Sequence, residues 1–274
     1  MAAASTPPGV GALLREWRTR RRLTQLDLAL DAGISPRHLS FVETGRSKPG
    51  RDLLLRLLEQ LEVPFRERNQ LLLSAGHAPA FPERALGDPD LAPVREALDL
   101  ILAGHEPYPA VAVDRHWNLV AANGALAALT AHVVVDPELL GPPVNVLRLG
   151  LHPRGLAPLY TNLGDWRRHF RERLVRQAMA SGDAELAALV EEIAGYPEPE
   201  QESGPVEGGG TGEILGPLKM RAPDGGELSF VGMFATFDTP FEVTASELAI
   251  ELLFPADKGT AERLAAMARD GGDT

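Results

Sequence analysis

Polar and basic side chains are concentrated in one short segment near the N-terminus, at the spacing of a helix surface. Arg37 can donate two hydrogen bonds to the edge of a guanine, and the imidazole of His38 can donate or accept one. Such side chains are typical of a helix that reads bases in the major groove of DNA. An ordinary solvated surface is the alternative for both residues. The candidates for base contact are Ser35, Arg37, His38 and Ser40, with Phe41 available for a thymine methyl, and the candidates for phosphate contact are Thr44, Arg46 and Lys48.

The elements that position these side chains begin with a short helix just before them. Thr24 and Asp27 have the spacing of a capping box, which predicts a helix over 25–32. Gly33 is expected to end that helix, because glycine adopts the positive φ that a tight helix terminus requires.

A second helix is predicted directly after this glycine. Ser35 is a favourable N-cap and Pro36 suits the first helical turn, and the pattern ends near Glu43. Three other amphipathic segments, at 11–22, 51–62 and 65–74, complete an all-α domain of five helices. The predicted apolar contacts between the paired helices come from Leu28, Ile34, Leu39 and Val42.

The stretch LTQLDLALDAGIS…HLSFVETGRSKP…LLLRLLEQLEVP, from Leu23 to Pro64, resembles the XRE family of helix-turn-helix regulators, which includes the phage repressors. The resemblance implies that the second helix of the pair lies in the major groove while the first crosses the phosphate backbone. It also implies that Gln25 contacts phosphate and that the chain binds double-stranded DNA as a homodimer, since one such module buries limited surface. Many relatives carry Gln or Arg where Pro36 stands, which implies a smaller set of base contacts here.

The rest of the chain predicts a different architecture, with domain boundaries at 1–80, a linker at 81–92 and a second domain at 93–274. Two strands are followed by several helices and then by three further strands, an order that predicts an α+β domain with an antiparallel sheet covered by helices on one face. An acidic, glycine-rich segment at 197–212 predicts a loop. The predicted strands are 109–114, 117–122, 215–222, 227–238 and 247–254, and the predicted helices are 93–104, 123–131, 144–151, 162–181, 183–194 and 259–269.

Three segments of this second domain, VDRHWNLVAAN (113–123), NVLRLGLHPRGL (145–156) and ELAIELLFPAD (247–257), resemble the PAS-like ligand-binding domain of the MmyB-like regulators. The long helix that starts at Asn162 is part of the same resemblance. It implies a domain that holds a small apolar ligand, for which a fatty acid is the usual suggestion in that family.

The segment LSFVGMFATF (228–237) is apolar on both faces, so both faces of this strand need cover. Helices can cover one face, and a ligand cavity or a dimer partner can cover the other. The alternatives are an ordinary core for the aromatic residues and a solvated surface for the arginines. The candidate lining is Trp117, Leu119, Trp166, Phe170, Phe230 and Phe234, and the candidates for a carboxylate head group are Arg148, His152 and Arg154.

The formal net charge of −11 is unevenly divided along the chain. Residues 1–80 hold 12 Lys+Arg and 8 Asp+Glu, whereas residues 81–274 hold 15 and 30. This asymmetry is typical of a nucleic-acid-binding module joined to an acidic module, although two unrelated solvated surfaces would show it too.

Composition also limits the classes of function. The chain has no cysteine, its start lacks the pattern of a secretion signal, and no apolar run is long enough to span a membrane, which together favour the cytoplasm. The seven histidines lack metal-ligand spacing, and no catalytic motif is present, so we expect no metal, no cofactor and no enzymatic activity. The sequence predicts a ligand-responsive, DNA-binding transcription regulator. The alternatives are a second domain that only dimerises or recruits a protein partner, and an enzyme fused to its own regulatory module.

Overall fold

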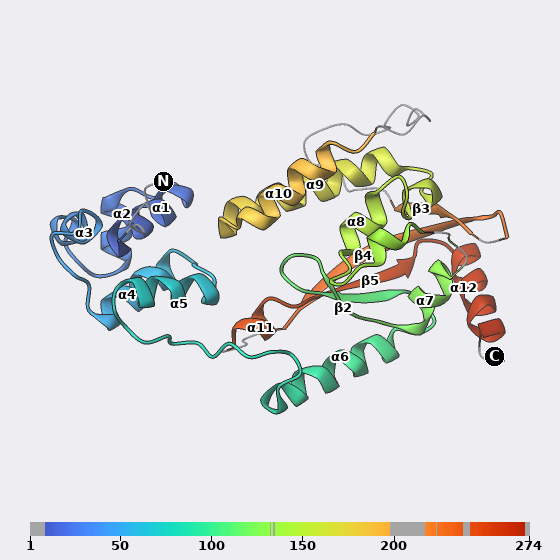
Figure 1. Ribbon diagram of the computed structural model, residues 1–274, viewed down its shortest axis with the longest axis horizontal. Coiled ribbons are helices and arrows are strands. Elements are labelled where there is room, and N and C mark those ends of the chain that lie inside the picture. Colours follow the sequence, from blue (N-terminus) through green and yellow to red (C-terminus); the bar gives the residue numbers. More distant parts are fainter. Residues whose placement is uncertain are drawn as a thin grey trace. The chain divides into compact units, whose positions relative to one another are not determined.

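The computed structural model describes residues 9–131, 133, 135–197, 217–222, 224–237 and 242–271 (Figure 1). The chain divides into two compact units. The first unit consists mainly of residues 1–84, and the second contains most of the remainder.

The N-terminal unit is built from five helices around one apolar core. Their sequence patterns predicted all five, and the observed ends lie within two residues of the predicted ones. Leucines at helical spacing supply most of the buried side chains, among them Leu14, Leu28, Leu39, Leu54 and Leu72. The helices are α1 (Val10–Arg20), α2 (Gln25–Asp31), α3 (Pro36–Glu43), α4 (Arg51–Gln60) and α5 (Phe65–Ser74).

Local capping fixes the helix-turn-helix pair. The Thr24 side chain accepts a hydrogen bond from the Asp27 amide, and the Asp27 carboxylate accepts one from the Thr24 amide, which is the predicted capping box. The side chain of Ser35 accepts a bond from the His38 amide at the start of α3. Gly33 between the helices has φ +67°, a conformation that glycine adopts without a Cβ penalty.

Gly11 allows α1 to lie against the end of α3. A Cβ atom at this position would lie 2.2 Å from the carbonyl oxygen of Val42 and 2.8 Å from that of Glu43. Any larger residue would force the two helices apart, so this glycine sets the approach of α1 to the pair.

A short segment from late in the chain also belongs to the N-terminal unit. It contains α11 (Val243–Ser246), whose Val243 is fully buried. The Val243 amide donates to the Pro82 carbonyl, and the Glu242 carboxylate accepts from the Arg84 amide at 2.8 Å. The sequence analysis did not predict this helix, because four residues are too few to show a helical period.

The C-terminal unit is organised around a five-stranded antiparallel sheet with the order β2-β1-β5-β4-β3. Its central strand β5 pairs with β1 on one side and β4 on the other, so strands from both ends of the domain meet in the middle. The strands are β1 (Ala110–Val113), β2 (Leu119–Ala122), β3 (Leu218–Arg221), β4 (Glu227–Thr236) and β5 (Ala249–Pro255).

Helices account for the remainder of this unit. The long α9 carries Trp166, Phe170 and Leu174 on its buried side, as its apolar spacing predicted. The helices are α6 (Ala92–Gly104), α7 (Gly124–Thr130), α8 (Val146–Leu151), α9 (Leu163–Ser181), α10 (Ala184–Ala194) and α12 (Lys258–Gly271), with 3₁₀ turns at Pro89–Leu91, Pro137–Leu140 and Ala157–Leu159.

The expectation that helices cover only one face of the sheet is wrong. Val111 and Val113 of β1 pack with the helices that include α9, whereas Ala110 and Ala112 pack with Leu98 and Leu102 of α6 on the other face. Figure 1 shows α6 and α9 on opposite sides of the sheet. The physical reason is that β1 is apolar at four successive positions, so it must be covered on both sides.

The fold class is confirmed as a five-helix domain followed by an α+β domain with an antiparallel sheet. The predicted strands and helices of the second domain are all present, each within three residues of its predicted bounds. Of the predicted acidic loop at 197–212, the part from 198 onward lies outside the described residues.

Candidate functional site

The surface of α3 divides into a buried and an outward-facing side. Leu39, Val42 and Glu43 are buried against the N-terminal core. Arg37 and Thr44 are exposed, and His38 and Ser40 are half-buried. The helix therefore presents polar side chains along the face that its apolar contacts leave free, as the candidate roles require.

Two arginines lie beside one aromatic ring on this surface. The guanidinium carbons of Arg37 and Arg46 lie 5.4 Å and 5.9 Å from the centroid of the Phe41 ring. Cation–π contact of this kind limits the rotamers of both side chains. A residue of α3 and a residue beyond its end thus place their positive charges on the same part of the surface.

The remaining candidates of this region have specific local roles. The Ser35 hydroxyl is engaged as the cap of α3, and the Thr44 hydroxyl donates to the Ser40 carbonyl at 2.7 Å. Lys48 is exposed beyond the helix. The structure therefore places all the candidate residues on or next to α2 and α3.

Gln25 is held in place by a buried carboxylate. The Glu43 carboxylate accepts a hydrogen bond from the side-chain Nε2 of Gln25 at 2.7 Å. It also accepts bonds from the Nε and Nη2 atoms of Arg18, at 2.7 and 3.0 Å. The hydrogen bond from Arg18 to Glu43 raises the pKa of the guanidinium. This network connects α1, α2 and α3, and it fixes the first residue of α2 relative to α3. The sequence analysis did not predict it.

In the C-terminal unit, the predicted aromatic residues do converge. The ring of Trp117 packs edge-on against Phe170 at 5.7 Å and against Phe234 at 5.5 Å, and Trp166 lies 5.4 Å from Phe170. Phe230 belongs to the same apolar cluster and is fully buried. The cluster is the main core of this unit.

The conformation of Trp117 directs its side chain into this core. Its φ of +67° is rare for a bulky residue. The turn that imposes this conformation is held by Asp114, whose carbonyl accepts from the Trp117 amide and whose carboxylate accepts from the His116 and Asn118 amides. The indole Nε1 donates to the Gln177 side chain at 3.1 Å.

The structure does not bring the other ligand candidates into this cluster. Leu119 lies on an edge strand and is 40% exposed. Arg148 pairs with Glu192 at 2.8 Å, and Arg154 pairs with Asp136. Tyr196 packs edge-on against His152. The two arginines therefore already have carboxylate partners from their own chain.

A pair of charged residues that the sequence analysis missed lies against the aromatic cluster. The guanidinium of Arg173 in α9 lies 3.6 Å from the centroid of Phe234 and 5.3 Å from that of Trp117. Glu251 of β5 is only 8% exposed. Burial raises the pKa of Glu251 to about 7, although the charge of Arg173 opposes this, and burial lowers the pKa of Arg173.

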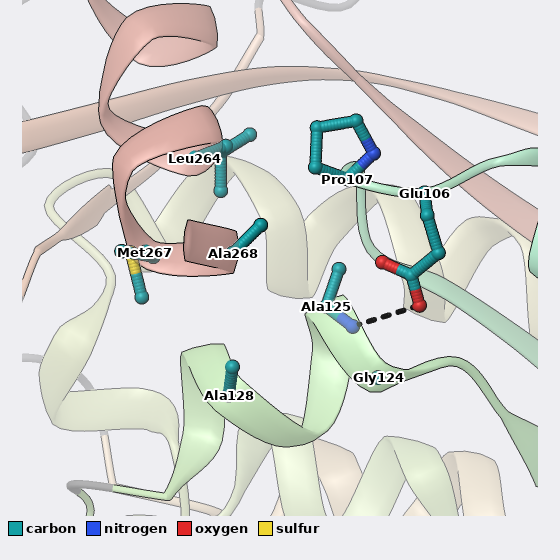
Figure 2. A pocket seen from close by; sticks show the side chains of 8 residues that line it. All are labelled: Glu106, Pro107, Gly124, Ala125, Ala128, Leu264, Met267 and Ala268. Carbon is teal, nitrogen blue, oxygen red and sulfur yellow. Dashed lines mark hydrogen bonds between the residues drawn. The ribbon is translucent and has the colours of Figure 1, made fainter. Parts of the chain in front are cut away.

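A separate pocket of about 230 Å³ opens between α7 and α12 (Figure 2). Its wall is mostly apolar, and Glu106 is the charged residue among those that line it. No sequence motif marked this pocket, because its walls come from three separate parts of the chain. The lining residues are Glu106, Pro107, Gly124, Ala125, Ala128, Leu264, Met267 and Ala268.

The described part of the chain contains no group of three or more His, Cys, Asp or Glu side chains placed to hold a metal ion. Within the same residues, no helix combines the length and the apolar character needed to cross a membrane.

Comparison with curated proteins gives a relative that matches part of the chain. The chain is 40% identical over 74 residues to the uncharacterized HTH-type transcriptional regulator RghRB of Bacillus subtilis (strain 168), a match that covers 27% of this chain and 51% of that protein. It therefore spans about half the length of this curated relative.

Two solved structures are also similar. The clp gene regulator ClgR from Corynebacterium glutamicum is 26% identical, with a TM-score of 0.22 over 36% of this chain and 90% of that one. An RNA-binding light-oxygen-voltage receptor is 14% identical, with a TM-score of 0.28 over 100% of this chain and 66% of that one. Both scores are too low to carry an argument about fold or function.

Two family profiles together cover most of the chain. A helix-turn-helix family matches residues 14–68, which include α2 and α3. The profile described as the MmyB-like transcription regulator ligand binding domain matches residues 94–267, which include the whole sheet. The chain is therefore a helix-turn-helix transcription regulator that belongs to the MmyB-like family, whose C-terminal domain is a ligand-binding domain.

Proposed function

We propose that this regulator binds a specific DNA operator as a homodimer, and that a small apolar ligand in the C-terminal domain modulates the binding. The DNA-binding part of the proposal is supported mainly by the exposed face of α3. There Arg37 and Arg46, which follows the helix, lie beside Phe41, while the opposite face of α3 is buried. The proposed site of action is the cytoplasm, and the function is binding without a catalytic step.

The proposed roles follow from position on the helix-turn-helix. Arg37, in the first turn of α3, contacts a guanine edge, with Ser35, His38 and Ser40 around it. Gln25, at the first turn of α2, contacts phosphate in the orientation that Glu43 gives it. Thr44, Arg46 and Lys48, which follow the end of α3, contact the phosphate backbone of the DNA.

Substitution of the two arginines tests these roles. Arg37→Ala is expected to reduce discrimination at one base pair by about 1–3 kcal/mol, because a bidentate contact is lost. Arg46→Ala is expected to weaken binding to all sequences and to reduce the slope of log affinity against log salt by about 1, because one phosphate contact is lost. Fluorescence anisotropy with operator variants at several salt concentrations measures both effects.

Arg171→Ala, an exposed arginine on α9, is the matched control and should change neither quantity. Equal and sequence-independent losses from Arg37→Ala and Arg46→Ala would show that the two roles are assigned incorrectly. Full-strength operator binding by both variants would refute the proposed surface.

Ligand control requires that the ligand bind two arrangements of the dimer with different affinity. The resemblance to the MmyB-like family implies a fatty acid as the ligand. Arg148 and Arg154 were candidates for binding the carboxylate head group of such a ligand. Their ion pairs argue against this role, because Glu192 and Asp136 already neutralise the two guanidinium groups. Native mass spectrometry of the purified chain tests ligand retention directly, and anisotropy with and without the retained ligand tests modulation.

One observation favours the second candidate function, in which the C-terminal domain only dimerises. Val231 and Met233 on β4 are 55% and 51% exposed in the single chain, as expected if a partner covers this face of the strand. Met233→Lys is expected to dissociate such a dimer without unfolding the chain, because the side chain is outside the core. Sedimentation velocity measures this, with Met179→Lys as control, because Met179 on α9 is also exposed, at 66%. An unchanged sedimentation coefficient for Met233→Lys would exclude this face as the dimer interface.

A further inference from the structure

The pocket between α7 and α12 has the size and lining of a site for a small molecule. Its volume is about 230 Å³, and Leu264, Met267, Ala125 and Ala128 give it an apolar wall (Figure 2). An engineered apolar cavity of about 150 Å³ binds benzene, so by proportion this pocket suits a compound of about nine non-hydrogen atoms. Met267 adds adaptability, because the methionine side chain is flexible and polarisable.

The charge in this pocket is anchored. One oxygen of the Glu106 carboxylate, Oε1, accepts a hydrogen bond from the Ala125 amide at 3.2 Å. Gly124 permits this approach, since a Cβ there would lie 3.1 Å from the same oxygen. Figure 2 shows the second carboxylate oxygen directed toward the space between the two helices. Glu106 is exposed, so its carboxylate is an acceptor with negative charge at the mouth of an apolar space, held there by one hydrogen bond.

These features select a particular chemistry. A carboxylate accepts hydrogen bonds and attracts positive charge, whereas it repels an anionic head group. Among the described residues that line the pocket, no lysine, arginine or histidine reverses this preference. A ligand with an apolar body and one protonated amino group can contact the apolar wall and also pair with the carboxylate. A fatty acid can contact the wall, but its own carboxylate is repelled by Glu106.

We infer that this pocket binds a small apolar amine, with its ammonium group on Glu106 and its apolar body between α7 and α12. The inference rests on the proposed ligand-sensing function and names the class of ligand. It also assigns specificity to Glu106, a residue outside the aromatic cluster predicted from the sequence.

The test uses three probes that share a phenyl ring, on the full-length chain: 2-phenylethylamine, 2-phenylethanol and 3-phenylpropanoate. Isothermal titration calorimetry is expected to show the amine binding at least about tenfold more tightly than the carboxylate, with the alcohol between them, because a hydrogen bond to a charged group exceeds a neutral one by about this factor. Glu106→Gln should weaken amine binding about tenfold and leave alcohol binding within about twofold, since glutamine keeps an acceptor for the Ala125 amide but has no charge.

A second variant tests the location independently of charge. Ala128→Leu should fill the pocket and abolish binding of the amine and the alcohol. Ala127→Leu is the control, because this neighbouring alanine on α7 is exposed and does not line the pocket. Glu96→Gln, at an exposed position of α6, is the control for the charge change.

Three results would overturn the inference: tighter binding of 3-phenylpropanoate than of the amine, amine binding that survives both Glu106→Gln and Ala128→Leu, or no binding of any probe. None of these bears on DNA recognition, which the Arg37 and Arg46 variants measure separately. A retained ligand found by native mass spectrometry to be an acid would likewise refute the amine while leaving ligand sensing intact.

Discussion

Glu43→Ala is expected to lower the free energy of unfolding of the N-terminal unit by about 3–5 kcal/mol, because it leaves a buried charge without its partner. The side chain of Glu43 is 1% exposed and that of Arg18 is 12% exposed, so water cannot readily replace the lost contacts. The Gln25 amide loses its acceptor in the same variant. Urea denaturation measures the loss, and native-state hydrogen exchange of α1 and α3 localises it.

Glu16→Ala is the matched control. Glu16 also pairs with an arginine, Arg20, but its side chain is 54% exposed, and such surface pairs contribute about 0–1 kcal/mol. Similar losses from the two variants would show that burial of Glu43 is not the source of its effect. Because Glu43 also orients Gln25, we expect weakened DNA binding in the Glu43 variant even where it remains folded.

The second large effect concerns the pH dependence of stability in the C-terminal unit. The pKa of Glu251 is raised from its ordinary value of 4.5 to about 7, so the folded state holds its proton more tightly than the unfolded state. The stabilising effect of this proton is complete below pH 4.5 and is lost as the pH rises through 7. The shift corresponds to about 3 kcal/mol, lost by the wild type between these limits.

Glu251→Gln replaces the neutral acid with a side chain of similar shape that does not ionise. The free energy of unfolding of this variant should equal that of the wild type near pH 4 and exceed it by about 3 kcal/mol at pH 8. Urea denaturation at each pH measures the difference. The neighbouring groups are Arg173, which favours ionisation, and Tyr160, whose pKa is itself raised by burial. Glu262→Gln, at an exposed position of α12, should show no such difference. Parallel pH curves for Glu251→Gln and the wild type would contradict the prediction.

Much of the N-terminal unit could be predicted because its signals are local. The Thr24–Asp27 capping box, Gly33 and the Ser35 cap each act within four residues, so the sequence alone locates the ends of α2 and α3. The periods of the apolar residues likewise identified the helices and strands of the C-terminal domain. The resemblance to the XRE and MmyB-like families, read from the same segments, is confirmed by the family matches.

The candidate ligand residues show where local signals end. The aromatic side chains were expected to converge and do so, because apolar groups of one domain share a core. Arginines can pair with any carboxylate that folding brings near, and the partners Glu192 and Asp136 of Arg148 and Arg154 lie 44 and 18 residues away in the chain. In the sequence, Glu251 stands out as a charged residue within the apolar segment ELAIELLFP. This pattern does not identify Arg173 of α9 as its neighbour.

The sequence by itself determined the helix-turn-helix, the individual helices and strands of the α+β domain and the face of α3 that carries Arg37, since these depend on residues close together in the chain. The tertiary structure decided that Glu43 joins three helices, that Glu251 is buried near Arg173, and that Glu106 lines a mostly apolar pocket. Each of these depends on the packing of distant elements, where small differences in approach determine which polar groups meet and which are left without a partner.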